Sequence, residues 1–187
     1  SKMYDSWKKI EMAYEGRIHT FDYGSKNLPG NLEVVAAPGH TPGHTVFRKT
    51  VTKKIEILKE SQSGKEKVQT EHKQDLLFIG DLIHGAALQF ENPDICAKFD
   101  MDSHLAVQSR ISILKKAVEP NVAISEIGTN TIPTLIFGAH LPFPGYGTLL
   151  VSNPVSSRKN SSSPNNSFSE HRTVKSKDSF QFIGVEP

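Results

Sequence analysis

The chain has 187 residues, of which 36% are hydrophobic and 22% charged, a balance typical of one globular domain or of a large part of one. Its net charge of +2 with neutral histidines gives no electrostatic reason to expect nucleic acid or an anionic membrane as a partner. No apolar run approaches the roughly 20 residues that cross a bilayer. The single cysteine, Cys96, excludes an internal disulfide and a zinc site built from several cysteines.

Two stretches have the apolar spacing of a helix. Residues 3–14 place four apolar side chains on one stripe, at i, i+4, i+7 and i+11: Met3, Trp7, Ile10 and Tyr14. Residues 105–118 have a second apolar face, which begins after the candidate caps Asp102 and Ser103. Pro120 is expected to end this second helix.

Runs rich in β-branched and apolar residues, bounded by glycine, proline or polar clusters, predict strands. They cover residues 17–24, 31–39, 44–51, 75–81, 134–140, 147–153 and 179–186. The charged stretch 53–74 is expected to be a solvated loop or hairpin tip. The Ser-, Asn- and Lys-rich stretch 152–178 is expected to be a flexible insertion, because it has almost no apolar surface to bury. Mixed strands and helices predict the α/β or α+β class.

Three of the predicted strands end in residues that can bind a metal. His40 follows "EVVAAPG", Asp81 follows "LLFIG" and His140 follows "LIFGA". Loops at strand ends, held by a rigid sheet, are common positions for functional sites. Imidazole and carboxylate ligands suit zinc, and also iron or manganese with less selectivity. The spacing alone does not establish a site, because a single histidine after a strand is more often a hydrogen-bonded structural residue.

The segments "APGHTPGH", "FIGDLIH" and "GAHLPFPG" together resemble the second half of the metallo-β-lactamase superfamily. The longer stretch "GDLIHGAALQFENPDICAKFDMDSHLAVQSR", followed by "HLPFPGYG", is most similar to the methyl parathion hydrolase-like branch, which also includes organophosphate hydrolases and lactonase-like enzymes. The resemblance implies a partial αββα sandwich, mainly its C-terminal half. Residues 1–151 and the terminal strand in 179–187 would belong to one domain, with 152–178 inserted between them. It also implies a hydrolase that acts on an ester, phosphoester or lactone bond of a small molecule.

The same resemblance implies a binuclear metal centre. His40 would bind the first metal, His140 the second, and Asp81 would bridge both. Two zinc ions are the expected cofactor, with manganese or iron as alternatives. A carboxylate has two oxygens and can span two cations about 3.5–4 Å apart, as two-metal hydrolases require. The nucleophile would be a hydroxide that bridges the two metals.

Further candidates lie close to these segments in the sequence. His44 is expected to be structural and to bond the backbone or a neighbouring carboxylate. His84 is expected to orient a ligand or to touch the substrate, with structural burial as the alternative. Phe90 and Phe143 are candidates for an apolar substrate wall, with core packing as the alternative. Helix capping and a local ion pair are expected of the polar residues around the start of the second helix, Asp100, Asp102 and Arg110.

The H-x-H-x-D-H motif of the superfamily is absent from this sequence. That motif supplies two histidines to the first metal and an aspartate and a histidine to the second. His40, Asp81 and His140 alone would leave each metal with two protein ligands, whereas catalytic zinc generally has three and a water. We therefore expect the C-terminal part of a metallo-hydrolase, inactive by itself. The alternatives are a non-catalytic half-fold remnant that serves as a binding or interaction module, and a glyoxalase II-like thioesterase of the same superfamily.

The sequence leaves the substrate, the native metal, the oligomeric state and the compartment open. It begins at Ser1 without an initiator methionine. We expect the true N-terminus, with any signal peptide, to lie outside this chain.

Overall fold

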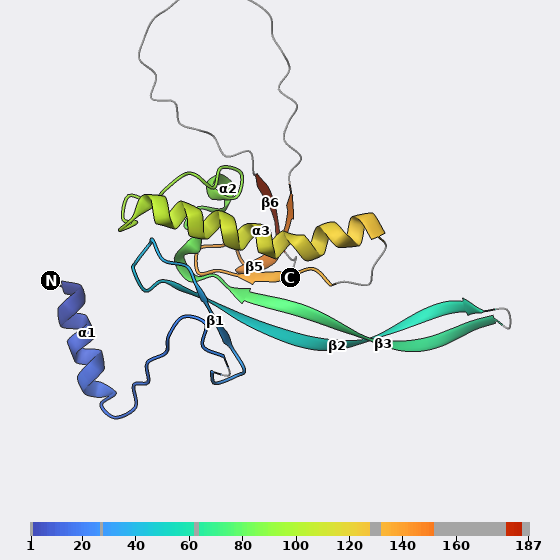
Figure 1. Ribbon diagram of the computed structural model, residues 1–187, viewed down its shortest axis with the longest axis horizontal. Helices are drawn as coiled ribbons and strands as arrows, with labels where there is room; N and C mark the ends of the chain where they lie inside the picture. The colour runs from blue at the N-terminus through green and yellow to red at the C-terminus, as the bar shows by residue number, and fades with distance from the viewer. Residues whose placement is uncertain (1, 27, 62–63, 128–131, 152–178, 185–187) are drawn as a thin grey trace, which may run out of the picture.

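The computed structural model describes residues 2–26, 28–61, 64–127, 132–151 and 179–184, and its fold is mixed α/β (Figure 1). The helical elements are α1 (Lys2–Ala13), the short 3-10 turn η1 (Gly80–Leu82), α2 (Ala86–Gln89) and α3 (Ser103–Ile127). The strands are β1 (Glu33–Ala36), β2 (Thr45–Ser61), β3 (Gly64–Phe78), β4 (Leu135–Phe137), β5 (Tyr146–Val151) and β6 (Phe180–Gly184). The predicted insertion 152–178 lies outside the described residues.

The strands form one sheet of six in chain order, β1-β2-β3-β4-β5-β6. Every neighbouring pair is antiparallel except β3 and β4, which are parallel. Parallel neighbours need a crossover connection, and here the segment that contains α2 and α3 makes it. The parallel register pairs Phe78 with Phe137, so β3 and β4 end side by side and the loops that follow them leave the sheet together.

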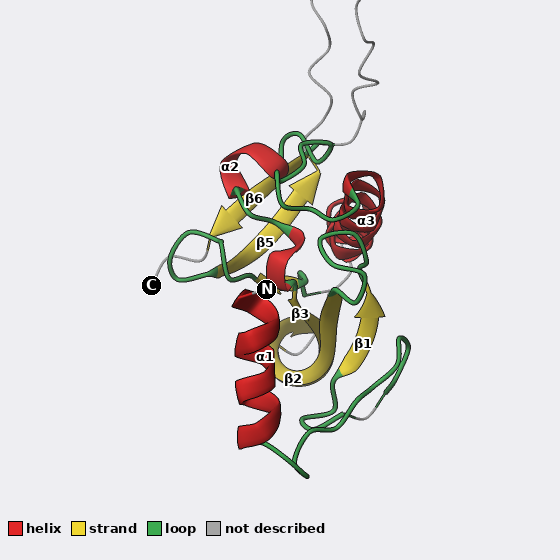
Figure 2. Ribbon diagram, turned by 90° about the vertical axis from the view of Figure 1, so that its left-hand side faces the viewer, coloured by secondary structure: helices red, strands yellow, loops and turns green. Residues whose placement is uncertain are grey.

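The hydrophobic core lies between the sheet and α3, which crosses one face of the sheet (Figures 1 and 2). The strands contribute Val46, Leu77, Ile136 and Leu149, all 7% exposed or less, and α3 contributes Ile113, Leu114, Ala117 and Val118. The apolar spacing of residues 105–118 therefore marks the face that α3 buries. No helix in the described part of the chain is long and apolar enough to cross a membrane.

The opposite face of the sheet carries a row of aromatic side chains. The strand register aligns Phe47, Phe78, Phe137 and Tyr146 across four strands. The rings of Phe78 and Phe137 stack at 5.0 Å between centroids, and those of Phe137 and Tyr146 at 5.2 Å. Phe78 is 38% exposed. Phe47, Phe137 and Tyr146 are half-buried, and the ring of Phe21 packs edge-on against that of Phe47 at 5.7 Å. A sheet normally buries its apolar face against another layer, and in the described residues this aromatic face is only partly covered.

Two predictions about elements are wrong. Residues 17–24 form coil and turns rather than a strand, because positive-φ glycines at 16 and 24 turn the chain at both ends of the segment. Helix α3 does not end at Pro120 but continues to Ile127. An internal proline costs a helix one backbone hydrogen bond and some steric strain. Helix α3 tolerates this cost because it has 25 residues and packs on the core before the proline, through Ile113 and Leu114.

The predicted helix over 3–14 is confirmed as α1, but its apolar stripe remains open to solvent. Trp7 is 47% exposed and Ile10 is 51% exposed, and Tyr14, just past the helix end, is 51% exposed. The spacing of apolar residues identified the helix correctly, because amphipathic periodicity depends on the local sequence alone. It did not predict what the stripe would contact.

The charged stretch 53–74 forms most of a long β-hairpin that projects from the rest of the molecule (Figure 1). Strand β1 pairs with β2 only as far as Arg48, and β4 pairs with β3 only from Leu76 onward. Beyond these points β2 and β3 form a two-stranded ribbon, held on one face by cross-strand polar pairs. These are Thr50 with Asp75 at 2.6 Å, Lys54 with Glu71 at 3.8 Å, and Glu56 with Lys67 at 2.6 Å.

Candidate metal centre

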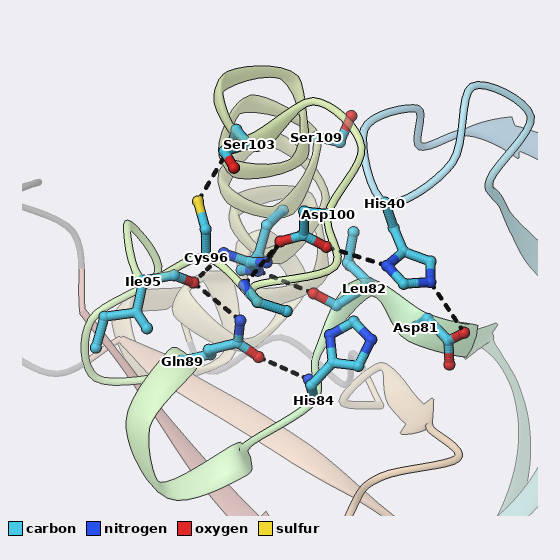
Figure 3. A network of polar contacts seen from close by, with 12 residues as sticks. His40, Asp81, Leu82, His84, Gln89, Ile95, Cys96, Asp100, Ser103 and Ser109 are labelled. Atoms are coloured by element: carbon cyan, nitrogen blue, oxygen red, sulfur yellow. Dashed lines mark hydrogen bonds and ion pairs between the residues drawn. The ribbon is translucent and has the colours of Figure 1, made fainter.

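Three loops at one edge of the sheet bring His40, Asp81 and His140 together. His40 lies between β1 and β2, Asp81 lies in η1 directly after β3, and His140 follows β4. The Oδ2 atom of Asp81 is 3.4 Å from Nε2 of His40 (Figure 3), and its Oδ1 atom is 3.2 Å from Nε2 of His140. The carboxylate of Asp81 therefore presents one oxygen to each imidazole.

The spacing of these donor atoms fits the ligands of a divalent cation. A tetrahedral zinc with bonds of about 2.0–2.1 Å holds its ligand atoms roughly 3.3 Å apart, close to the 3.4 and 3.2 Å between the oxygens of Asp81 and the two imidazoles. Two groups of three residues in the described part of the chain have ligand atoms within 4.8 Å of one another: His40, His84 and Asp100, and Asp81, His84 and His140. Nitrogen and oxygen donors of these types suit zinc.

Asp100 orients the ring of His40. Its carboxylate is fully buried, and its Oδ1 atom lies 3.0 Å from Nδ1 of His40 (Figure 3). The backbone N–H of Ala97 donates to the other oxygen at 2.9 Å. A carboxylate on Nδ1 holds the proton on that nitrogen and leaves the Nε2 lone pair directed at a metal. Asp102 instead caps α3 by accepting the backbone N–H of Leu105 at 2.9 Å.

Arg110 ties the loops behind the centre to α3. Its side chain is 1% exposed and donates to the carbonyls of Leu82 at 2.9 Å, Pro93 at 2.6 Å and Ile95 at 2.8 Å. Its Nη2 atom is 3.8 Å from the carboxylate of Asp100. Burial lowers the pKa of the Arg110 guanidinium and the charge of Asp100 opposes that shift. The predicted local ion pair is thus present, and it supports the carboxylate that holds His40.

His44 has both ring nitrogens engaged with the backbone. Nδ1 donates to the carbonyl of Ala37 at 3.0 Å, and Nε2 accepts the backbone N–H of Asp81 at 3.1 Å. Burial lowers the pKa of His44, which favours the neutral ring that this pair of bonds requires. The ring joins the His40 loop to the Asp81 loop and has no nitrogen left for a metal.

His84 lies close to both imidazoles of the centre (Figure 3 shows it below His40). Its ring centroid is 4.8 Å from that of His40 and 5.1 Å from that of His140. Its Nδ1 atom is buried and makes no hydrogen bond within the described residues. Burial lowers the pKa of His84, and the neighbouring His40 acts in the same direction.

The two candidate wall residues have different surroundings. Phe90 is 1% exposed and its ring stacks on that of Phe182 at 5.2 Å. Both line a cavity of about 520 Å³ that also reaches Ala86 and Pro142, which lie two residues beyond His84 and His140 in the chain. Phe143 is 89% exposed. A pocket of the size that small molecules occupy, lined by both apolar residues and the polar Glu91 and Gln181, thus reaches the loops that carry His84 and His140.

Sequence reasoning identified His40, Asp81, His140, His44 and His84 as residues of this region, and the structure brings all five together. It assigned Asp100 to helix capping and ion pairing and missed its contact with His40. The two residues are 60 positions apart in the chain. No local pattern could have revealed that contact.

Neither the comparison with family models nor the search of curated proteins gives a match. Several chains in solved structures are similar, including the following two. AidC, a dizinc quorum-quenching lactonase in complex with the product N-hexanoyl-L-homoserine, has 23% identity, a TM-score of 0.56, and coverage of 97% of this chain and 42% of its own. The hydrolase AbOPH of the β-lactamase superfamily has 21% identity, a TM-score of 0.59, and coverage of 97% and 44%. The chain spans less than half the length of either, and it has in part the metallo-β-lactamase fold of these two proteins.

Proposed function

We propose that this chain belongs to a metal-dependent hydrolase of the metallo-β-lactamase superfamily, in its methyl parathion hydrolase-like branch. Its substrate would be a small molecule with an ester, phosphoester or lactone bond, and its cofactor two divalent cations, preferably zinc. One observation carries the proposal: Asp81 directs its two oxygens at two different imidazoles, those of His40 and His140. The similarity to a dizinc lactonase supports zinc and this class of substrate.

The chain's own residues have distinct tasks in this proposal. His40, Asp81 and His140 would hold the cations, which when bound supply Lewis acidity and an activated water. Asp100 keeps the proton of His40 on Nδ1, so that Nε2 is free to ligate. The pocket beside Phe90, which has apolar and polar walls, would take part of the substrate.

We further propose that a second segment, outside this chain, completes the site. His40 and Asp81 would supply two ligands to the first cation, and Asp81 and His140 two ligands to the second. Catalytic zinc generally has three protein ligands. Asp81 is 41% exposed and His140 is 46% exposed, so both are accessible to further ligands. The partly covered aromatic face of the sheet, on which Phe78 is 38% exposed, supports the same idea, because such a face is normally covered by a second layer. Residues 1–151 and 179–187 would then form one half of a sandwich.

The test begins with the coding sequence upstream of Ser1, which is expected to encode H-x-H-x-D-H. The protein with and without that segment is then loaded with zinc or manganese and assayed on a lactone, a phosphotriester, an aryl ester and a glutathione thioester. We expect turnover of one or more of the first three substrates, and only by the longer protein. Turnover of the thioester alone would identify the glyoxalase II-like alternative. No bound metal and no turnover would leave a binding or interaction module.

A further inference from the structure

We propose that His84 is a metal ligand, and that Asp81, His84 and His140 form a three-ligand site that lets this chain hold one divalent cation by itself. The inference rests on the proposed function, because it uses the same edge of the sheet. It differs from the ligand set that the sequence implies, in which His84 orients a ligand or touches the substrate.

Asp81, His84 and His140 have the geometry of a three-ligand site. One ligand atom from each of Asp81, His84 and His140 lies within 4.8 Å of the other two. The rings of His84 and His140 are 5.1 Å apart and inclined by 30°. Three protein ligands and one water make up the usual catalytic zinc site. His84 thus supplies the ligand that the pair Asp81 and His140 lacks.

The ring nitrogens of these histidines differ in whether they are available to a metal. Both nitrogens of His44 are occupied by backbone partners, and Nδ1 of His40 faces Asp100. His84 instead has a buried Nδ1 without a hydrogen bond among the described residues. Buried polar atoms in folded proteins are nearly always paired, so an unpaired one calls for an explanation such as a bound ion. Of the two possible three-residue groups that include His84, the one with Asp100 is less suitable, because both oxygens of Asp100 already have protein partners.

The backbone at His84 is fixed in place. The N–H groups of His84 and Gly85 both donate to Oε1 of Gln89, at 2.6 and 3.1 Å. Gln89 is 3% exposed, and its Nε2 donates to the carbonyl of Ile95 at 2.9 Å. The His84 ring also rests on Phe99, with 4.8 Å between the ring centroids. A ligand whose backbone and ring are held before the metal arrives needs little ordering when the metal binds.

The test is a titration of the purified chain with Co²⁺, followed by visible absorption. We expect one Co²⁺ per chain, with the intense d–d bands of a low-coordinate site. His84→Ala should weaken binding at least about tenfold, since even residues that only support a ligand change metal affinity 10–100-fold. Asp81→Ala should also weaken binding. His104→Ala, which removes an exposed histidine from α3, is the matched control and should bind as the wild type does.

The outcomes separate this inference from the proposed function. If His84→Ala binds Co²⁺ like the wild type while Asp81→Ala does not, His84 is not a ligand and the proposed site stands. If Asp81→Ala also binds normally, both the inference and the proposed site fail. Side-chain ¹⁵N spectra of the wild type guard against a misfolded variant: zinc should shift the His84 imidazole signals and leave those of His44 in place. Unchanged His84 signals at saturating zinc would overturn the inference.

Discussion

Arg110→Met gives a direct measure of how much the buried polar support behind the centre contributes to stability. Arg110 is 1% exposed and is the donor to three backbone carbonyls, those of Leu82, Pro93 and Ile95. It also lies 3.8 Å from the buried carboxylate of Asp100. Methionine keeps much of the side-chain volume but donates nothing, so the substitution removes the hydrogen bonds and the charge without opening a large cavity.

The size of the loss can be estimated from these contacts. Each carbonyl left without a donor costs about 1–3 kcal/mol. Removing one partner of a buried ion pair costs about 3–5 kcal/mol. These contributions overlap, because protonation of Asp100 and entry of water relieve part of each. We expect the free energy of unfolding to fall by about 4–6 kcal/mol, a large share of the roughly 5–15 kcal/mol of a typical domain.

Urea unfolding followed by far-UV circular dichroism measures this difference. Lys116→Met is the matched control, because it removes an exposed cation from the same helix and should change the stability by less than about 0.5 kcal/mol. A double variant with Asp100→Asn should lose less than the sum of the two single losses, because the residues share one buried network. A loss below about 1 kcal/mol for Arg110→Met would refute the reasoning.

Three more outcomes are expected. Asp81→Ala should retain less metal than His44→Ala in elemental analysis of the purified proteins, because only Asp81 faces two imidazoles; a greater loss in His44→Ala would reverse this assignment. Asp100→Asn should weaken zinc binding about 10–100-fold in competition with a chromophoric chelator, and an unchanged affinity would contradict its orienting contact with His40. Gly39→Ala should lower the unfolding midpoint markedly, because position 39 has φ +134 and an added Cβ would collide with the start of α3; a wild-type midpoint in calorimetry would show that the loop relaxes freely.

The sequence was most informative where structure depends on a short local pattern. The apolar runs at "LLF" and "LIF" correctly predicted strands, although only Leu77 and Ile136 of them are buried, and the periodicity of residues 105–118 correctly predicted a helix that packs on the core. The strand ends then indicated where His40, Asp81 and His140 would lie. Strands β1, β3 and β4 run in the same direction, so the loops that follow them leave the sheet at one edge. The residues of the centre could be proposed from the sequence for this reason.

The sequence was least informative where long-range packing decides the outcome. Pro120 ends helices in most contexts, but α3 continues beyond it. The high charge of residues 53–74 suggested a solvated loop or hairpin tip; the hairpin is present, but paired strands with cross-strand pairs such as Lys54 with Glu71 make up most of the stretch. The contact between Asp100 and His40 depends on a loop that folds back from the start of α3. None of these features has a signature in a short window of sequence.

The projecting ribbon has a consequence for the order of folding. Its two strands pair through residues that are close in the chain, starting with Ser61 and Gly64. The hairpin can therefore form within microseconds without contacts from the rest of the molecule. The parallel pair of β3 and β4 instead joins Leu76 to Leu135, and that pairing must await the whole intervening crossover. Asp81 and His140 are therefore expected to come together only late in folding. A cation supplied during refolding would act after the ribbon has formed, and its effect would be seen in the late kinetic phase alone.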